Sequence, residues 1–297
     1  MFRFRQLFSL FGILAFVAYT LAFPLKPRDG APVAISSAQT KQYIIPAQFA
    51  SSAYCTTLKR GSILAEDAKI LYYAGDGRKI QRVYVAHSPS QGIIVAYQGT
   101  NTSSIHSIED DIEPVRKHVD SRLAFLGKDV KISDGFQDQW LLTADKVLNE
   151  TKKALKQYHH SNLLVVGHSL GAALALLTSA YISNNINATL QTVLFGLPRV
   201  GNDEFANAID KYVPDQNHIV NYHDPVPHLP GKSLGFQSPS GEIWINHNGS
   251  YSALRCPGQE NPQCSDSVPF YEYDVDNHLG PYFGIYMGSH NCSASRY

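Results

Sequence analysis

The sequence has no excess of charge of either sign. Its 25 lysine and arginine residues balance 25 aspartate and glutamate residues, so the formal net charge at pH 7 is zero with histidine neutral. Proteins that bind nucleic acid usually carry a clustered basic surface, and anionic membranes recruit runs of lysine and arginine. The chain has neither feature. Its composition therefore argues against a nucleic-acid partner and against recruitment to anionic membranes by charge.

Cysteine is scarce, and the common zinc motifs are missing. Because no C-x-x-C or H-E-x-x-H sequence occurs, we expect no metal site. The four cysteines are Cys55, Cys256, Cys264 and Cys292. In an exported chain an even number predicts two disulfides, with three possible connectivities. Cys256 and Cys264 enclose the short segment "CPGQENPQC", which favours a local disulfide and leaves Cys55 to pair with Cys292.

No hydrophobic run is long enough for an ordinary membrane-spanning helix, which needs about 20 apolar residues. The apolar segment "LFSLFGILAFVAYTLA" has about 16 residues, follows Arg3 and Arg5, and ends in small residues before Pro24. This pattern predicts a cleaved secretory signal peptide over residues 1–22, with an uncleaved signal anchor as the alternative. Cleavage leaves 23 basic and 25 acidic residues, a net charge of −2 (23 − 25). We therefore expect a secreted, extracellular protein with no integral membrane span after signal cleavage.

Glycosylation sequons agree with export. An N-x-S/T sequence marks a possible attachment site for a glycan in a secreted protein. Five such sequons begin at Asn101, Asn149, Asn187, Asn248 and Asn291.

The chain also lacks internal repeats and long linkers, so we expect residues 23–297 to form a single domain. Apolar patterns predict strands at about 79–87 and 92–98, joined by the turn "SPSQG", and one amphipathic helix after Gly135. "NLLVVG" is typical of a central parallel strand, and "LGAALALLTSAYISNN" of a helix. Downstream, "LQTVLFG" and "NHIVNYH" predict strands on either side of the helical "NDEFANAIDKY". This alternation predicts an α/β fold with a predominantly parallel central sheet flanked by helices.

Two pentapeptides satisfy G-x-S-x-G, the spacing of a nucleophilic serine on a sharp turn between a strand and a helix. They are "GHSLG" at 167–171 and "GKSLG" at 231–235. "LLVV" precedes the first and a helical pattern follows it, whereas prolines surround the second. The flanks therefore favour Ser169 over Ser233 as the nucleophile. The amide of Leu170, at the start of the helix, would face the developing oxyanion.

A serine hydroxyl becomes an effective nucleophile when a histidine accepts its proton and a carboxylate orients that histidine. Asp224 follows the strand-like "NHIVNYH" at a proline-rich loop, and His278 lies in "YDVDNHLGPYFG" after a β-like stretch. The order Ser169, Asp224, His278 is the order of this class of hydrolase. His228 is close in sequence to Asp224, and we interpret His168 as a packing or hydrogen-bonding residue. The other downstream candidates are Asp203, Asp210, Asp215 and Asp276 for the acid, and His247 and His290 for the base.

Several blocks of the chain resemble a known family. "VVGHSLGAALALL", "FGLPRVGN", "NYHDPVPHLP" and "DNHLGPYFG" are similar to the matching blocks of the secreted fungal class 3 lipases, which are α/β-hydrolases. The resemblance runs from about residue 40 to residue 292. "AHSPSQGIIVAYQGTN", "GFQSPSGEIWI" and "PGQEN" resemble the mono- and diacylglycerol lipase branch. The resemblance implies that Ser169 is the nucleophile, Asp224 the orienting acid and His278 the base. It also implies the disulfides Cys55–Cys292 and Cys256–Cys264.

The resemblance also implies a second oxyanion donor at Thr100 in "YQGTN", which would act together with Leu170. The amide and the hydroxyl of Thr100 are both potential donors. Members of the family often have arginine before the glycine, where this chain has Gln98. Because a glycan on Asn101 would crowd this site, we expect that sequon to be unused.

The family places a lid at "SSIHSIEDDIEP". Ile105, Ile108 and Ile112 follow i, i+3, i+7 spacing and form one apolar stripe, as in a short amphipathic helix. Such a helix can cover an acyl site in water and move outward at a lipid interface, although an ordinary surface helix has the same pattern. The segment lacks the tryptophan that many lids of the family carry, so we expect weaker or different interfacial activation.

Together these features predict a secreted serine ester hydrolase. The expected reaction is cleavage of fatty-acyl esters of acylglycerols, mono- and diacylglycerol in particular, at a lipid–water interface. It would proceed through an acyl-enzyme on Ser169 without a metal ion or an organic cofactor. Alternatives on the same fold are a feruloyl esterase and a phospholipase. A non-catalytic secreted lipid-binding protein is a third, which the intact serine, aspartate and histidine set argues against.

Overall fold

The computed structural model describes residues 30–100, 114–288 and 292. The predicted signal peptide at 1–22 lies outside the described residues. The predicted lid residues Ile105, Ile108 and Ile112, and the sequon residues Asn101 and Asn291, also lie outside them.

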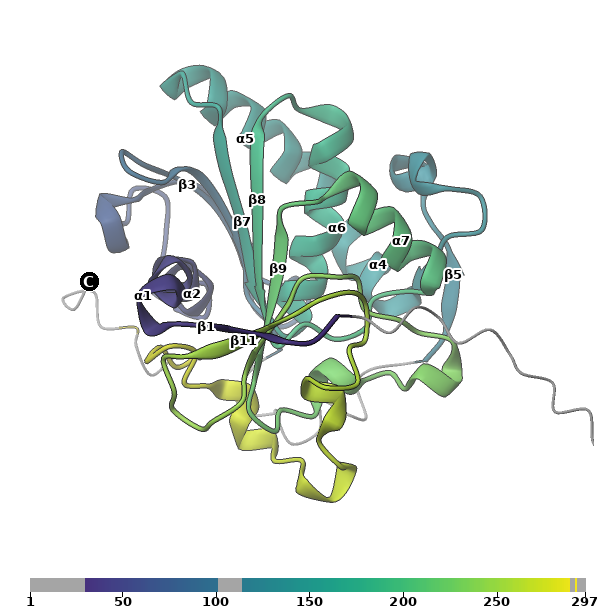
Figure 1. Ribbon diagram of the computed structural model, residues 1–297. Coiled ribbons are helices and arrows are strands. Elements are labelled where there is room, and N and C mark those ends of the chain that lie inside the picture. Colours follow the sequence, from purple (N-terminus) through teal and green to yellow (C-terminus); the bar gives the residue numbers. More distant parts are fainter. Residues whose placement is uncertain (1–29, 101–113, 289–291, 293–297) are drawn as a thin grey trace, which may run out of the picture.

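A twisted sheet of nine strands forms the centre of the described structure (Figure 1). Its middle strands pair in parallel, and antiparallel pairs complete the two edges. This arrangement confirms the predicted, predominantly parallel sheet. From edge to edge the strands are β1 (Val33–Ile35), β11 (Ala253–Cys256), β10 (Glu242–Ile245), β9 (Gln216–Asn221), β8 (Thr189–Phe195), β7 (Asn162–His168), β4 (Gly92–Tyr97), β3 (Val83–Ser88) and β2 (Lys69–Ala74).

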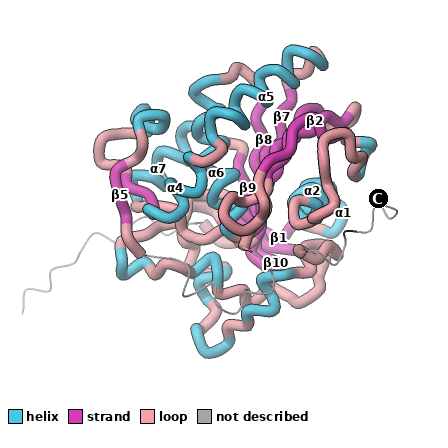
Figure 2. The backbone as a smooth tube through the Cα atoms, turned by 180° about the vertical axis from the view of Figure 1, so that it is seen from behind, coloured by secondary structure: helices cyan, strands magenta, loops and turns pink. Residues whose placement is uncertain are grey.

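Helices cover both faces of this sheet, as the views from the front and from behind show (Figures 1 and 2). Val165 of β7 packs toward the larger helical layer, and its neighbour Val166 packs toward the opposite layer. Because β7 is buried on both faces, it reads as a continuous apolar run rather than as an alternation. One layer contains α4 (Asp134–Leu141), α5 (Ala144–Tyr158), α6 (Leu170–Asn185) and α7 (Asp203–Tyr212), and the other contains α1 (Ser37–Thr40) and α2 (Ile44–Ser52).

The single amphipathic helix expected after Gly135 is wrong, because the structure has two helices there. α4 ends at Leu141, and α5 begins at Ala144. Between them Thr143 has φ −129°, which is outside the helical region and interrupts the hydrogen-bond ladder. The break lets α4 bury Trp140 against α6, where its indole nitrogen donates to Thr178 Oγ1 at 3.1 Å.

Seven elements form where the sequence predicts them. They are the hairpin of β3 and β4, followed by β7, α6, β8, α7 and β9. The β-like stretch expected before His278 does not form a strand; that segment consists of 3₁₀ turns. A separate two-stranded sheet joins β5 (Arg116–His118) to β6 (Lys131–Ser133). The 3₁₀ turns are η1 (Lys41–Tyr43), η2 (Ala65–Asp67), η4 (Ser121–Leu126), η5 (Val226–His228), η6 (Lys232–Leu234), η7 (Ser265–Ser267), η8 (Phe270–Glu272) and η9 (Val275–Leu279).

Two disulfides link distant and neighbouring parts of the chain. Cys55, which follows α2, is bonded to Cys292, and Cys256 at the end of β11 is bonded to Cys264. In the described part of the chain no helix is long and apolar enough to span a bilayer. The described sequon residues, Asn149, Asn187 and Asn248, are exposed.

Candidate active site

Ser169 lies on the tight turn between β7 and α6. Its φ is 59° and its ψ is −133°, a conformation that residues other than glycine adopt rarely and that functional turns often impose. The turn is too crowded for side chains at its first glycine, because a Cβ on Gly167 would overlap the carbonyl oxygen of Gly171. The strand, turn and helix predicted around Ser169 are therefore present. Ser233, in the second pentapeptide, lies on the exposed 3₁₀ turn η6 instead.

Asp224 and His278 are in direct contact and fully buried. The Nδ1 of His278 lies 2.8 Å from Oδ2 of Asp224. The other oxygen, Oδ1, accepts the backbone N–H of Val226 at 2.9 Å, which fixes the carboxylate on the loop after β9. Because the carboxylate can only accept, Nδ1 of His278 carries the proton and Nε2 presents its lone pair.

The free Nε2 of His278 and the hydroxyl of Ser169 both lie at the carboxyl end of β8. Ser169 N donates to the carbonyl oxygen of Phe195 at 3.0 Å, and the imidazole of His278 packs directly against Gly196. Ser169 Oγ and His278 Nε2 are both buried and form no hydrogen bond with the described residues. The two atoms that a proton transfer would join are therefore adjacent to one strand end and not engaged elsewhere.

The two residues predicted as oxyanion donors, Leu170 and Thr100, directly follow Ser169 and Gly99 in the chain. Leu170 is the first residue of α6, and amides in the first turn of a helix have no partner within it. Gly99 lies directly against the nucleophile turn, because a Cβ there would overlap the carbonyl oxygen of His168 and lie 2.9 Å from Cβ of Ser169. Thr100, which is half-buried, is the next residue after this contact.

Gln98, the departure from the family pattern, has a defined partner. Its Oε1 accepts a hydrogen bond from Nη1 of Arg82 at 2.8 Å, and Nη2 of Arg82 donates to the carbonyl oxygen of Asp76 at 2.9 Å. An arginine from the neighbouring strand region thus supports the segment that leads to Thr100.

A buried tyrosine and a buried histidine connect the predicted oxyanion segment, residues 98–100, to the backbone of His278. The Nε2 of His168 lies 2.7 Å from the carbonyl oxygen of His278, and its Nδ1 lies 2.6 Å from the hydroxyl of Tyr54. Burial lowers the pKa of His168 well below its usual value, so the ring is neutral. Since a carbonyl only accepts, Nε2 carries the proton and Tyr54 donates to Nδ1. The hydroxyl of Tyr54 also packs directly against Gly99, where a Cβ would overlap it, and burial raises the pKa of Tyr54.

Tyr282 adds a further contact to Asp224 and His278. Its hydroxyl lies 3.3 Å from Oδ2 of Asp224 and 3.1 Å from the carbonyl oxygen of His278. Sequence reasoning missed both Tyr54 and Tyr282. Their signals were weak: Tyr54 precedes Cys55, and Tyr282 lies within the quoted block "DNHLGPYFG".

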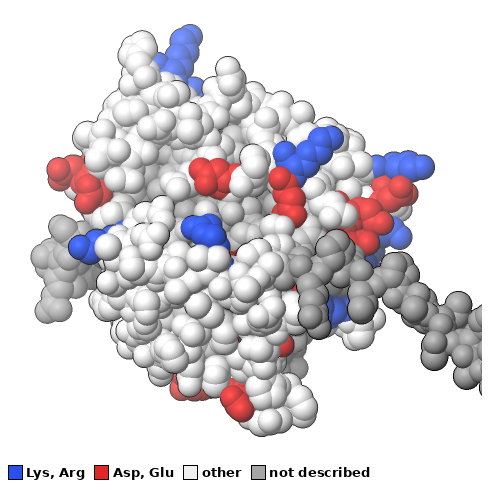
Figure 3. All heavy atoms as spheres, in the orientation of Figure 1, with Lys and Arg blue, Asp and Glu red and all other residues white. Residues whose placement is uncertain are grey.

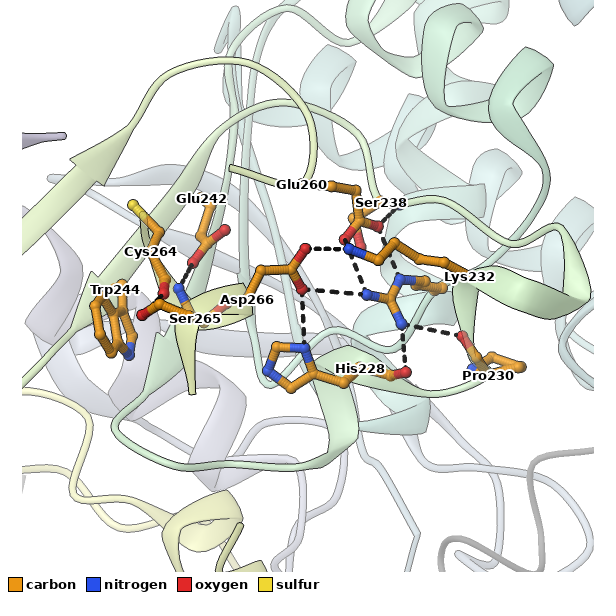
Figure 4. Close-up of polar contacts among 12 residues, drawn as sticks. His228, Pro230, Lys232, Ser238, Glu242, Trp244, Glu260, Cys264, Ser265 and Asp266 are labelled. Atoms are coloured by element: carbon orange, nitrogen blue, oxygen red, sulfur yellow. Dashed lines mark hydrogen bonds and ion pairs between the residues drawn. The ribbon is translucent and has the colours of Figure 1, made fainter. Parts of the chain in front are cut away.

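A buried ion-pair cluster holds the loop that follows Asp224 (Figure 4). The guanidinium of Arg199 binds Glu260 through Nε at 2.8 Å and donates to the backbone oxygens of His228 and Pro230. Asp266 contacts Arg199, His228 and Lys232. Burial alone would raise the pKa of Asp266, but hydrogen bonds from His228 and Lys232 and the positive charge of Lys232 outweigh it and lower that pKa. His228 is therefore part of this cluster and not of the site.

No metal centre is suggested by the described residues. Their one cluster of ligand-type side chains is Glu242 with Cys256 and Cys264. The two sulfur atoms are bonded to each other, so they are not available as thiolate ligands.

Known proteins resemble the chain in sequence and in structure. Residues 94–234 match the family "Lipase (class 3)". The chain is 37% identical over 295 residues, 96% of each sequence, to a secreted mono- and diacylglycerol lipase of Malassezia globosa. It superposes on lipase II from Rhizopus niveus with a TM-score of 0.78 and 27% identity, over 87% of this chain and 99% of that one. A triacylglycerol lipase whose catalytic centre is described as a serine protease triad gives a TM-score of 0.76 and 28% identity, over 89% and 100%.

The sequence similarity extends over nearly the whole chain, and the structural neighbours share its sheet and helices. They confirm the predicted α/β-hydrolase fold and the predicted class of enzyme. The chain belongs to the class 3 lipase family of secreted ester hydrolases.

Proposed function

We propose that this protein hydrolyses fatty-acyl esters of mono- and diacylglycerols through an acyl-enzyme on Ser169. The observation that carries the proposal is the buried Asp224–His278 pair, whose free Nε2 lies with the Ser169 hydroxyl at the end of β8. The substrate class is taken from the relative in Malassezia globosa, which is named a mono- and diacylglycerol lipase.

In the proposed mechanism His278 acts first as a base and then as an acid. Its Nε2 accepts the proton of Ser169 as Oγ attacks the ester carbonyl carbon. Asp224 holds the ring in the tautomer with the proton on Nδ1 and stabilises the imidazolium that forms. His278 then protonates the leaving glyceride oxygen, and a water molecule attacks the acyl-enzyme with His278 as base again.

Three hydrogen-bond donors are proposed to stabilise the negative charge that develops on the carbonyl oxygen. They are the backbone amides of Thr100 and Leu170 and the hydroxyl of Thr100. Preorganised donors of this kind stabilise the transition state by about 3 kcal/mol each, because they are already oriented when the charge appears. The contact of Gly99 with the nucleophile turn supports this assignment.

We further propose how the chain is processed during export and how it opens at a lipid surface. Residues 1–22 act as a signal peptide and 23–297 form the mature domain. Ile105, Ile108 and Ile112 form the apolar face of a lid that opens at a lipid–water interface.

The test is the rate of hydrolysis of a soluble ester, p-nitrophenyl butyrate, by matched serine variants. Ser169→Ala removes the nucleophile and should lower kcat by about 10⁴-fold or more. Ser233→Ala, at the same position of the second pentapeptide, should leave the rate unchanged. Equal activity of Ser169→Ala and the native protein would refute the assigned nucleophile.

A substrate panel then tests the acyl class. Rates on diacylglycerol, monoacylglycerol, triacylglycerol, a phospholipid and a feruloyl ester should be highest for the first two. Fastest turnover of the feruloyl ester or of the phospholipid would replace the proposed substrate with one of the alternatives. No hydrolysis of any ester above the Ser169→Ala variant would favour a non-catalytic lipid-binding protein.

A further inference from the structure

Two neighbouring aromatic side chains project into solvent at η8. Phe270 is 81% exposed and Tyr271 is 75% exposed, more than any other large apolar side chain in the described part of the molecule. Their rings contact each other edge to face, with centroids 5.7 Å apart. Exposing two adjacent aromatic rings to water is unfavourable, and such patches usually mark interaction sites.

This aromatic pair lies on the face of the molecule that carries the site. Its segment runs from η7 into η9, which contains His278. It packs on the loop after β9: His223 Nδ1 lies 3.0 Å from the carbonyl oxygen of Glu272, and Asp274 N donates to the carbonyl oxygen of His223 at 3.0 Å. In Figure 1 the segment, coloured yellow-green, forms the lowest part of the molecule, beyond the carboxyl ends of the parallel strands.

Both sides of the projecting segment are fixed to the body of the protein. Before the pair, Asp266 is held by Arg199, His228 and Lys232 in the buried cluster (Figure 4). After it, the ring of Tyr273 stacks on His228 with centroids 4.9 Å apart. A rigidly presented pair loses little conformational freedom when it enters another phase, so more of the burial energy contributes to binding.

The charge around the pair selects the kind of surface that it can enter. Between residues 265 and 279 the segment has no lysine or arginine, and it carries exposed acidic side chains at Glu272, Asp274 and Asp276. In Figure 3 the lower end of the molecule shows acidic but no basic side chains. An anionic membrane would repel this segment, whereas an uncharged lipid surface would not.

We propose that Phe270 and Tyr271 form an anchor that inserts into the surface of uncharged acylglycerol droplets and holds the active-site face against them. The inference rests on the proposed acylglycerol hydrolase function. Phe270 enters the apolar phase, and Tyr271 places its ring in the interface with its hydroxyl toward water. The anchor is separate from the reacting groups. It affects how strongly the protein adsorbs to the droplet and not how fast the bound ester reacts.

Adsorption is measured on proteins that carry Ser169→Ala, so that the droplets are not consumed. Diolein emulsions and phosphatidylglycerol vesicles are mixed with protein and separated by flotation. Replacing both rings, as F270S/Y271S, should lower the partition coefficient onto diolein about tenfold to a hundredfold, as expected for two exposed aromatic side chains that lose burial. F270L/Y271L should retain adsorption. The control is Ile63→Ser: Ile63 is 56% exposed and lies next to the start of β2, at the opposite end of the sheet.

The outcomes separate this inference from the proposed function. Equal adsorption of F270S/Y271S and its parent, or equal losses with Ile63→Ser, would overturn the anchor. Stronger adsorption to phosphatidylglycerol than to diolein would overturn the choice of an uncharged surface. With Ser169 restored, F270S/Y271S should hydrolyse p-nitrophenyl butyrate at an unchanged rate, which shows that the site is folded. Adsorption through the pair without acylglycerol hydrolysis by the native protein would refute the function and leave the anchor standing.

Discussion

At the scale of single residues, the site depends on which atoms carry protons. The Asp224 carboxylate, the His278 imidazole and the His168 imidazole each have one assignment that their partners allow. His168 is adjacent in sequence to Ser169, the proposed nucleophile, yet its two nitrogens are occupied by a carbonyl and a tyrosine hydroxyl. It is therefore a positioning residue, and His278 has the only nitrogen of this pair that is free to accept a proton.

Tyr54→Phe tests this connection. The change leaves the Nδ1 of His168 without a partner, which costs about 1–3 kcal/mol for a buried group, and it removes the hydroxyl that packs against Gly99. We expect kcat on p-nitrophenyl butyrate to fall about tenfold with KM nearly unchanged, because the oxyanion segment and the base lose their support while the acyl site does not. Tyr43→Phe removes a hydroxyl that lies 3.5 Å from Asn217, and serves as the control. A purely structural role for Tyr54 would lower stability and leave kcat intact.

Sequence patterns identified these residues unevenly. Ser169 was distinguishable because a strand and a helix leave strong local signals on either side of it. Tyr54 and Tyr282 act through contacts with residues 114 and 58 positions away, and no local pattern reports such distances. The same holds for Arg199, whose partner Glu260 is 61 positions away.

At the scale of elements, buried parallel strands and the apolar helix α6 were predictable because their composition follows from burial on all sides. The boundary between α4 and α5 was not, because an apolar spacing of helical period continues through Thr143. The strands β1, β11 and β10 on one side of the sheet, and the edge strand β2 on the other, were also missed. They are short or irregular in pattern, and their pairing is decided by the rest of the sheet.

Strand β10 carries a carboxyl group that makes the element sensitive to pH. Burial raises the pKa of Glu242 to about 7, from a usual value of 4.5. The folded protein therefore favours the protonated form. Above pH 4.5 the unfolded chain releases this proton while the folded protein keeps it, so the free energy of unfolding falls as the pH rises. The stability that the protonated carboxyl contributes is complete below pH 4.5 and is lost as the pH rises through 7, a loss of up to about 3 kcal/mol.

Glu242→Gln should remove this loss, because the amide oxygen still accepts the backbone N–H of Ser265, which lies 3.0 Å from Oε1 of Glu242. Urea unfolding at pH 5 and pH 8 measures the change. We expect the variant to be more stable than the native protein at pH 8, with a smaller difference at pH 5. Glu272→Gln, at an exposed position, controls for loss of one carboxylate. If the difference in free energy of unfolding between Glu242→Gln and the native protein were the same at pH 5 and at pH 8, the raised pKa of Glu242 would be contradicted.

At the scale of the whole molecule, the two disulfides constrain the unfolded chain very differently. Cys55 and Cys292 are separated by 237 positions, and Cys256 and Cys264 by 8. Because the loss of chain entropy grows with the logarithm of loop length, the first should stabilise the fold by about 5 kcal/mol and the second by about 3 kcal/mol.

Paired serine variants test that difference. Replacing Cys55 and Cys292 together should lower the free energy of unfolding more than replacing Cys256 and Cys264 together, as measured by denaturant titration at fixed pH. The second variant is the natural control, because it removes the same number of sulfur atoms. A larger loss from the short loop would show that local packing, and not chain entropy, dominates.

The long-range disulfide also sets an order of events during synthesis. Tyr54, which packs against Gly99, directly precedes Cys55, whose partner is translated 237 residues later. That bond therefore forms only after nearly the whole domain has been made and delivered to an oxidising compartment. The covalent bond beside Tyr54 cannot form until the chain has been made through Cys292 and has reached such a compartment.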